Sequence, residues 1–360
     1  MTATMDTAGA DAGYPMRRWV FDDSLGRFDI DLGDSHVQCG ALDDLRVPVD
    51  LELNYGVDQG HIVLRELIAA RYRGRGDSVL VTHGAQEALY LAYSVLLRPG
   101  DQVITFRPGW QQSWEVPPLL GATVDVLGLD ADFAIDVAAV AETATDRLRI
   151  IVVNSPCNPT GRVVAADDLA ALLEIAERAG AYLLLDEEYA TDLSSSLATR
   201  HGNVVSVSSL SKIYGLPGLR LGWLYTEPEL TAACTRRKHL TTIANSVLTE
   251  TLAVNVLARA GDYLARYQEL VGPGLAMLRE WVSGHAGQLT LVEPQGTPFT
   301  WLWLHRAESS LEFCRRVLDE RVLVMPGETL GAGGGIRLSF AREPQVLAEG
   351  LAAISKVLRS

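Results

Sequence analysis

Between about residue 60 and residue 230 the sequence alternates short, continuously apolar runs with segments of helical spacing. The runs at 148–154, 182–185 and 204–207 each end in polar residues. Between the first two, residues 165–179 place apolar side chains at helical intervals, and Gly180 then favours a helix end. Apolar strands separated by amphipathic helices are typical of a parallel sheet covered by helices. The sequence therefore predicts an α/β layer fold.

The last hundred residues follow a different pattern, in which short predicted strands and helices are mixed. The predicted strands span 300–304, 322–324 and 336–340, and the predicted helices span 311–318 and 346–358. This mixture indicates a small α+β domain. We expect four parts: a flexible tail (1–16), an N-terminal segment that packs on the small domain (17–50), a large domain (51–255) and the small domain (256–360).

Composition and charge limit the partners and the compartment. With 360 residues, 48% hydrophobic and 21% charged, the chain is long enough for two domains of an ordinary globular protein. Its net charge of −14 would repel nucleic acids and anionic membranes, so we predict neither as a partner. Its four cysteines are far apart and form no CxxC pair, which favours a reduced, cytoplasmic protein without a metal site.

Four residues with chemical potential lie at or just after the ends of three successive predicted strands: Asn158, Asp186, Tyr189 and Lys212. In an open parallel sheet, ligands bind beyond the carboxyl ends of the strands. We therefore expect these side chains to meet at one site.

Lysine is rare in this chain, and its positions narrow the choice of a covalent residue. Besides Lys212, only Lys238 and Lys356 are present. We expect Lys238, next to two arginines, on a solvated basic surface and Lys356 at an exposed helix position. Lys212 is then the lysine available for chemistry.

The residues around Lys212 offer donors for a phosphate. Ser209 and Ser211 precede the lysine, and Arg220 ends the GLPGLR sequence that follows; hydroxyl and guanidinium groups bind phosphate well. Gly84, Ala85 and Gln86 open a predicted helix after the strand at 78–81, and helix N-termini attract anions. We predict a phosphate site built from both segments.

The remaining side chains complete the requirements of pyridoxal 5′-phosphate (PLP). PLP needs a lysine for an imine, a carboxylate opposite its pyridine nitrogen, an aromatic face and an anion site. Asp186 follows a buried strand, where a carboxylate needs a cationic partner such as a pyridinium. Trp110 can stack on the ring. We predict PLP as the cofactor, bound to Lys212.

The order of these motifs resembles the fold type I, class I/II aminotransferase family of PLP-dependent enzymes. The similarity runs from about Tyr55 to Arg337, through THGAQEA, NSPCNPTG, DEEY, SLSK, YGLPGLR and IRLSF. It implies a PLP-dependent transferase fold of type I, with a mainly parallel seven-stranded sheet in the large domain and a small α+β domain.

The resemblance also implies roles for single residues. Lys212 would form the Schiff base and then move the Cα proton, and Arg337 would bind the α-carboxylate of the substrate. Tyr55 would reach the phosphate of the neighbouring subunit, which implies a homodimer with shared sites. The cofactor would further contact Gly84, Ala85, Gln86, Trp110, Asn158, Asp186, Tyr189, Ser209, Ser211 and Arg220.

Two reactions remain open for such an enzyme. Transamination of an L-amino acid is our first hypothesis. The alternative is cyclodehydration of a hydroxyarginine, since phrases such as LSKIYGLPGLRLGW and VLVMPG resemble a subgroup that includes capreomycidine synthase. Part of the substrate pocket would come from residues 31–36, where Gly33 and Asp34 are candidates and Asp31 and Asp34 could hold a guanidinium.

A third hypothesis is a regulator that binds PLP without catalysis. Regulators of this kind join the same domain to an N-terminal DNA-binding helix-turn-helix. Only about fifty residues precede Tyr55, they show no such pattern, and the chain is acidic. We therefore predict an enzyme.

Overall fold

The computed structural model describes residues 14–42, 45–46 and 48–359. Its larger sheet has seven strands in the order β2-β8-β7-β6-β5-β3-β4, and only β8 runs antiparallel to its neighbours. This confirms the mainly parallel sheet. The strands are β2 (Val79–Thr82), β3 (Gln102–Arg107), β4 (Thr123–Gly128), β5 (Leu148–Asn154), β6 (Tyr182–Asp186), β7 (Val204–Ser209) and β8 (Gly222–Tyr225).

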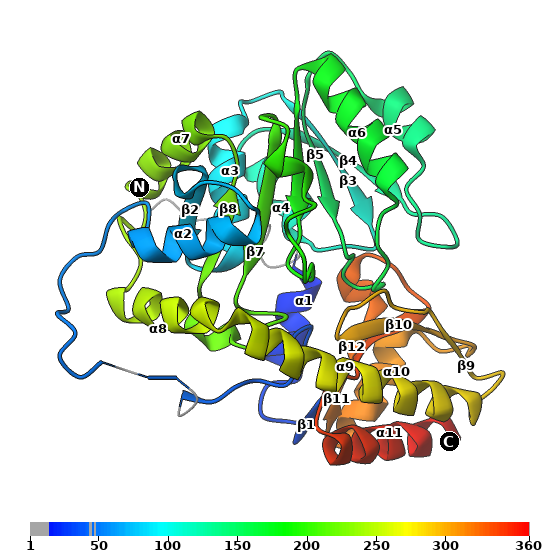
Figure 1. Cartoon of the computed structure of the whole chain (residues 1–360). Helices are drawn as coiled ribbons and strands as arrows, with labels where there is room; N and C mark the ends of the chain where they lie inside the picture. Colours follow the sequence, from blue (N-terminus) through cyan, green and yellow to red (C-terminus); the bar gives the residue numbers. More distant parts are fainter. Residues whose placement is uncertain (1–13, 43–44, 47, 360) are drawn as a thin grey trace, which may run out of the picture.

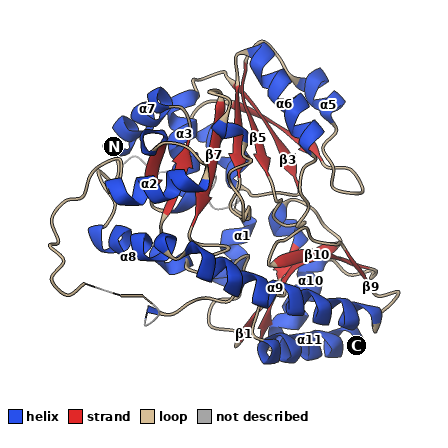
Figure 2. Cartoon of the chain, in the orientation of Figure 1, coloured by secondary structure: helices blue, strands red, loops and turns tan. Residues whose placement is uncertain are grey.

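Helices cover both faces of this sheet (Figures 1 and 2). Successive side chains of a strand point to opposite faces, so a continuously apolar strand feeds two cores. In β5, Ile150 and Val152 pack in the cluster that contains α3, and Ile151 and Val153 pack in the cluster that contains α6. The helices around the sheet are α2 (Ile62–Arg71), α3 (Gly84–Leu96), α4 (Gln112–Leu119), α5 (Val137–Thr143), α6 (Ala166–Ala179), α7 (Pro228–Lys238) and α8 (Val247–Ala258).

The rest of the chain forms a smaller antiparallel sheet in the order β12-β13-β10-β9. The long helix α9 leads from the larger sheet to this part of the molecule (Figure 1). Its elements are α9 (Ala260–Ser283), β9 (Leu289–Leu291), β10 (Phe299–Leu304), α10 (Ser310–Asp319), β11 (Val322–Leu323), β12 (Met325–Pro326), β13 (Gly335–Ser339) and α11 (Pro344–Arg359). Short 3-10 turns lie at η3 (Gly76–Ser78), η4 (Leu197–Thr199), η5 (Pro217–Leu219) and η6 (Gly327–Leu330).

The N-terminal segment lies against this smaller part. Strand β1 (Ile30–Asp31) pairs in parallel with β11, where Ile30 faces Val322. Before it, α1 (Pro15–Arg17) continues into the π-helical turn η1 (Arg18–Asp23), and the buried Trp19 donates its indole N–H to the carbonyl of Val324 at 3.1 Å. We expected a flexible tail over residues 1–16. Residues 1–13 lie outside the described part of the chain, and residues 15 and 16 belong to α1.

The expected surface position of Lys238 is wrong. Its side chain is 0% exposed, and Nζ donates to the carbonyls of Val81 (2.8 Å) and Asp58 (3.0 Å) and to the side chain of Asn245. A buried cation needs such partners. The Lys238 side chain thereby links the three segments that contain Asp58, Val81 and Asn245. Lys356 is exposed as expected and pairs with Glu320 at 2.8 Å. No described helix has the length and apolar character that a membrane span requires.

Candidate active site

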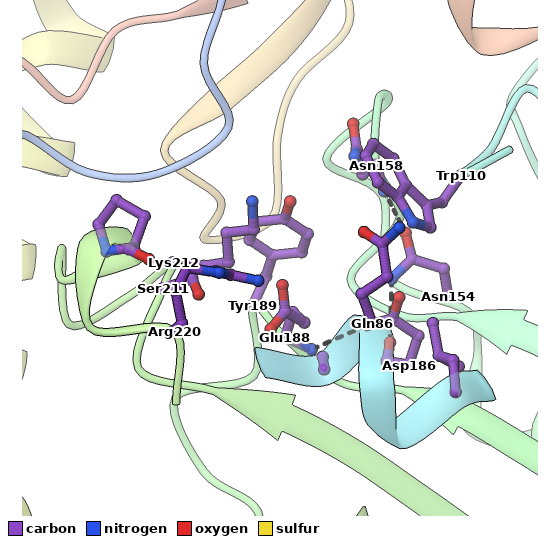
Figure 3. Close-up of a pocket in the computed structure, with 13 residues that line it drawn as sticks. Gln86, Trp110, Asn154, Asn158, Asp186, Glu188, Tyr189, Ser211, Lys212 and Arg220 are labelled. Carbon is purple, nitrogen blue, oxygen red and sulfur yellow. Dashed lines mark hydrogen bonds between the residues drawn. The ribbon is translucent and has the colours of Figure 1, made fainter. Parts of the chain in front are cut away.

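A cavity of about 180 Å³, partly open to solvent, lies beyond the carboxyl ends of β5, β6 and β7. Parallel strands bring their ends to one edge, so the residues that follow them in sequence converge there. Figure 3 shows the side chains that line it. They are Ala85, Gln86, Leu89, Trp110, Asn154, Asn158, Asp186, Glu188, Tyr189, Ser211, Lys212, Pro217 and Arg220.

Lys212 reaches the cavity from the loop after β7. Its Nζ donates to the hydroxyl of Ser35 at 2.9 Å, and its carbonyl accepts from the N–H of Val37 at 3.2 Å. Sequence reasoning missed Ser35. The only signal for it was its place in the 31–36 stretch, which was expected to form part of the substrate pocket.

Asp186 ends β6 directly beside the end of β5, where it pairs in register with Asn154. Burial first, and then the charge of Glu188, raise the pKa of the Asp186 carboxyl to about 8. The N–H of Glu188 donates to Asp186 Oδ1 at 3.2 Å. This carboxylate lacks a cation strong enough to offset its burial, so a bound cationic group would restore its ionised form.

The residues predicted to bind a phosphate lie close to one another where α3 begins. Gly84 adopts a φ of +76°, and a Cβ at this position would lie 2.6 Å from a guanidinium nitrogen of Arg220. Glycine therefore allows the arginine to lie against the helix N-terminus. Ser209 accepts the N–H of Ser211 at 3.0 Å, which fixes the loop that carries the Ser211 hydroxyl into the cavity. The Arg220 guanidinium and the Ser211 hydroxyl thus line the cavity where the helix dipole also favours an anion.

Arg337 lies on β13 of the smaller sheet and contacts the site through Asn158. The residue is 2% exposed, and its guanidinium donates to Asn158 Oδ1 at 2.7 Å and to the carbonyl of Gly33. Its Nε has no hydrogen-bond partner among the described residues. Phe299 lies under the guanidinium at 5.5 Å and meets the Tyr189 ring edge-on at 4.9 Å. A buried guanidinium with an unused donor is suited to a carboxylate ligand.

The two acidic residues expected to hold a guanidinium already have partners. Asp31 Oδ1 accepts the backbone N–H groups of Gly33 (2.7 Å) and Asp34 (2.9 Å). Asp34 Oδ2 lies 2.8 Å from His36 Nε2. Although burial opposes charge on both, their mutual hydrogen bond lowers the pKa of Asp34 and raises that of His36 to about 9. The substrate roles of Gly33 and Asp34 therefore stay predictions.

Tyr55 lies apart from the other predicted residues. Its side chain is 83% exposed, and it is not among the described residues that line the cavity. The described residues leave this side chain largely open to solvent, so its expected role depends on a second subunit.

The residues present fit PLP. Asp186 is a buried carboxylate that needs a cation, the start of α3 with Arg220 and Ser211 offers an anion site, and Lys212 supplies an amine at the same cavity. Trp110 lines the opposite side and presents an aromatic face (Figure 3). Four separate requirements of the cofactor are thus met by residues at or after the ends of β2, β3, β6 and β7.

Comparison with known proteins agrees with this geometry. The family model described as aminotransferase class I and II matches residues 51–354. Capreomycidine synthase of Streptomyces vinaceus is 33% identical over 315 residues, which cover 84% of this chain and 80% of the relative. Aspartate aminotransferase of Thermotoga maritima is 29% identical over 326 residues, 86% of this chain and 84% of the relative.

Two solved structures are similar over most of their length. A PLP-dependent aminotransferase from Streptococcus suis has a TM-score of 0.89 at 27% identity and covers 95% of this chain and 96% of its own. The PLP-dependent cyclase OrfR has a TM-score of 0.87 at 31% identity, with the same coverage of 95% and 96%. This chain belongs to the class I and II aminotransferase family and is a PLP-dependent enzyme.

Proposed function

We propose that the protein transaminates an L-amino acid, with Lys212 as its covalent and proton-transferring residue. The observation that carries this proposal is that Lys212 and the buried Asp186 line one cavity, and that the buried Arg337, with its unused Nε, donates to the cavity residue Asn158. An amine, an anchored cofactor ring and a carboxylate receptor are the three parts that a reaction at the Cα of an amino acid requires.

When bound, PLP supplies the electron sink that stabilises negative charge at Cα. The protein supplies position and proton transfer. Arg337 binds the α-carboxylate, Asn158 holds Arg337 in place, and Asp186 keeps the ring nitrogen protonated. The Lys212 amine, once free, accepts the Cα proton, and the Ser35 hydroxyl at 2.9 Å limits where that amine can lie.

Cyclodehydration of a hydroxylated arginine is the second candidate. It is favoured by the 33% identity to capreomycidine synthase and by the 31% identity and TM-score of 0.87 to the cyclase OrfR. Both reactions begin with loss of the Cα proton, so the residues described above serve either one.

A single-turnover experiment separates the two reactions. Holoenzyme is mixed with one L-amino acid at a time, including arginine and hydroxyarginines, without a keto acid. Transamination converts the bound cofactor to its amine form and yields one equivalent of keto acid. Return of the original absorbance with a dehydrated or cyclised product would instead establish the cyclodehydratase.

We expect Arg337→Lys to reduce kcat/KM for L-amino acids about 10- to 100-fold, mainly through KM. Loss of one hydrogen bond to a charged group corresponds to about 1.5–3 kcal/mol, and a lysine cannot bind a carboxylate in a bidentate way. The control is the matching amine without a carboxylate, whose turnover should change little. An equal loss for acid and amine would contradict the proposed role.

We also propose a homodimer with shared sites. Exposed apolar side chains gather in and near the loop that carries Tyr55, which extends away from the body of the molecule (Figure 1). Large exposed apolar surface commonly marks a protein interface. These side chains include Val49, Leu53, Tyr55, Val57, Ile62, Val63, Leu240, Ile243 and Leu248.

Mixed dimers test this proposal. We expect Tyr55→Phe and Lys212→Ala proteins to be weakly active or inactive alone, and to regain about a quarter to a half of the wild-type activity when co-refolded. One site of each mixed dimer then has both residues intact, provided that Tyr55 serves the partner's cofactor. A mixture no more active than its components, although mixed dimers are seen by native mass spectrometry, would refute the shared site.

The four cysteines are free in the structure, which supports a reduced cytoplasmic protein.

The division into residues 17–50, 51–255 and 256–360 also remains our proposal. Limited proteolysis of the apoprotein, with cleavage near residue 50 or 255, is the direct check on these limits.

A further inference from the structure

The DEEY sequence carries a residue that the proposed reaction does not use. Glu188 lines the cavity and is 9% exposed. Its Oε1 is buried and has no hydrogen-bond partner among the described residues. A buried carboxylate oxygen without a partner is costly, and the cavity is where a compensating ligand group could reach it.

The adjacent Glu187 shows the opposite arrangement. Its Oε2 accepts from the hydroxyl of Ser196 at 2.7 Å and from that of Ser206, and Glu187 is not among the described residues that line the cavity. Two neighbouring glutamates therefore differ in one respect. Glu187 is hydrogen-bonded within the protein, whereas Glu188 lines the cavity with its Oε1 unpaired among the described residues.

The charge of Glu188 acts on other groups of the cavity. After burial, it is the largest influence that raises the pKa of Asp186, whereas Glu187 has a smaller effect on the same carboxyl. Glu188 is also the second cause, again after burial, of the raised pKa of Tyr189. Its field thus extends over the region where the cofactor ring would lie.

The position of Glu188 relative to the predicted ring is informative. In Figure 3 it lies on the side of the cavity that carries Tyr189 and Lys212, whereas Trp110 lies on the other side. A ring stacked on Trp110 would have its second face toward Glu188. Other charges around this space are Asp186 at the end of β6 and the adjacent Glu187, Lys212 and Arg220 after β7, Arg337 on β13 and Asp34 in the N-terminal segment.

We propose that Glu188 is a second carboxylate of the cofactor site, which supplies negative charge to the protonated nitrogen that joins PLP to Lys212. The inference rests on the proposed attachment at Lys212 and is independent of whether the enzyme transaminates or cyclises. An opposite charge within about 4–6 Å favours the protonated form and typically shifts a pKa by about 1–3 units. Glu188 therefore keeps the cofactor positively charged, and more reactive toward an amine, at higher pH.

The test is an absorbance titration of the holoenzyme without substrate, for wild type, Glu188→Gln and Glu187→Gln. We expect Glu188→Gln to lower the pKa of the bound chromophore by about 1–3 units. Glu187→Gln replaces the neighbouring carboxyl group, keeps an acceptor for both serines, and should cause a clearly smaller shift. An unchanged pKa in Glu188→Gln, or equal shifts in both variants, would overturn the proposal.

Thermal unfolding of the apoprotein gives a second measurement. Glu188→Gln removes an unpaired buried charge, so we expect the apoprotein to melt at the same or a higher temperature and to gain less when PLP is added. A destabilised apoprotein with an unaltered gain from PLP would show a structural role instead. A different result would show that PLP is not attached to Lys212. In that case Lys212→Ala would keep the absorbance titration of the wild type, independent of the result for Glu188→Gln.

Discussion

Lys212→Ala should lower kcat by at least about 10⁴-fold, because in the proposed function this residue provides both covalent attachment and the proton transfer at Cα, and a general base alone contributes about 10²–10⁴. Lys212→Arg should be equally inactive. Arginine keeps the positive charge but stays protonated, so it can neither form the imine nor accept a proton. Comparison of Lys212→Ala with Lys212→Arg therefore separates the effect of losing the positive charge from the effect of losing the reactive amine.

The chain offers matched controls because it contains only three lysines. Lys356→Ala should leave kcat unchanged, since that side chain is exposed and pairs with Glu320 away from the cavity. Borohydride reduction of the holoenzyme followed by peptide mapping should place the cofactor on the peptide that contains Lys212. Label on Lys238 would contradict the assignment, and the three acceptors that surround its Nζ make that residue unsuitable.

Asp186→Asn should have the second largest effect, a loss of about 10²- to 10³-fold in kcat, similar to removal of one strong electrostatic contact at a reacting centre. An amide cannot hold the ring nitrogen in its protonated state, so the electron sink weakens while binding of the substrate carboxylate at Arg337 persists. KM should therefore change less than kcat. Asp192→Asn, an exposed position on the same loop, serves as the control.

The raised pKa of Asp186 also predicts how the stability of the apoprotein depends on pH. Its pKa in the folded state, about 8, lies above the ordinary 3.8. Between these values the folded state keeps a proton that the unfolded state releases, so the free energy of unfolding falls as pH rises through this window. Glu187, raised to about 7 by burial, contributes with the same sign.

Thermal melts of apo and holo protein across this window check the linkage. We expect the apo wild type to lose stability as pH rises, and Asp186→Asn to depend on pH less strongly. Added PLP should also flatten the wild-type curve, since a pyridinium offsets the buried charge. An apo wild type that becomes more stable toward pH 8 would show that Asp186 is ionised without the cofactor.

The secondary structure could be predicted because it is encoded locally. The apolar run at 148–154 became β5, and the helical spacing before Gly180 became α6, which ends at this glycine in the left-handed conformation. The meeting of Asn158, Asp186 and Lys212 also followed from sequence. Parallel strands fix which of their ends lie together, so residues placed after those ends share one edge.

Contacts between distant segments could not be predicted in this way. Lys212 meets Ser35 across 177 positions, and Arg337 meets Asn158 across 179. No local pattern distinguishes the satisfied Glu187 from the unpartnered Glu188, or marks Lys238 as buried. The sequence by itself determined most of the elements, the choice of Lys212 as the proposed covalent residue, and the edge of the sheet where the cavity lies. The tertiary structure alone decided which polar groups are paired, because pairing depends on which segments burial forces together.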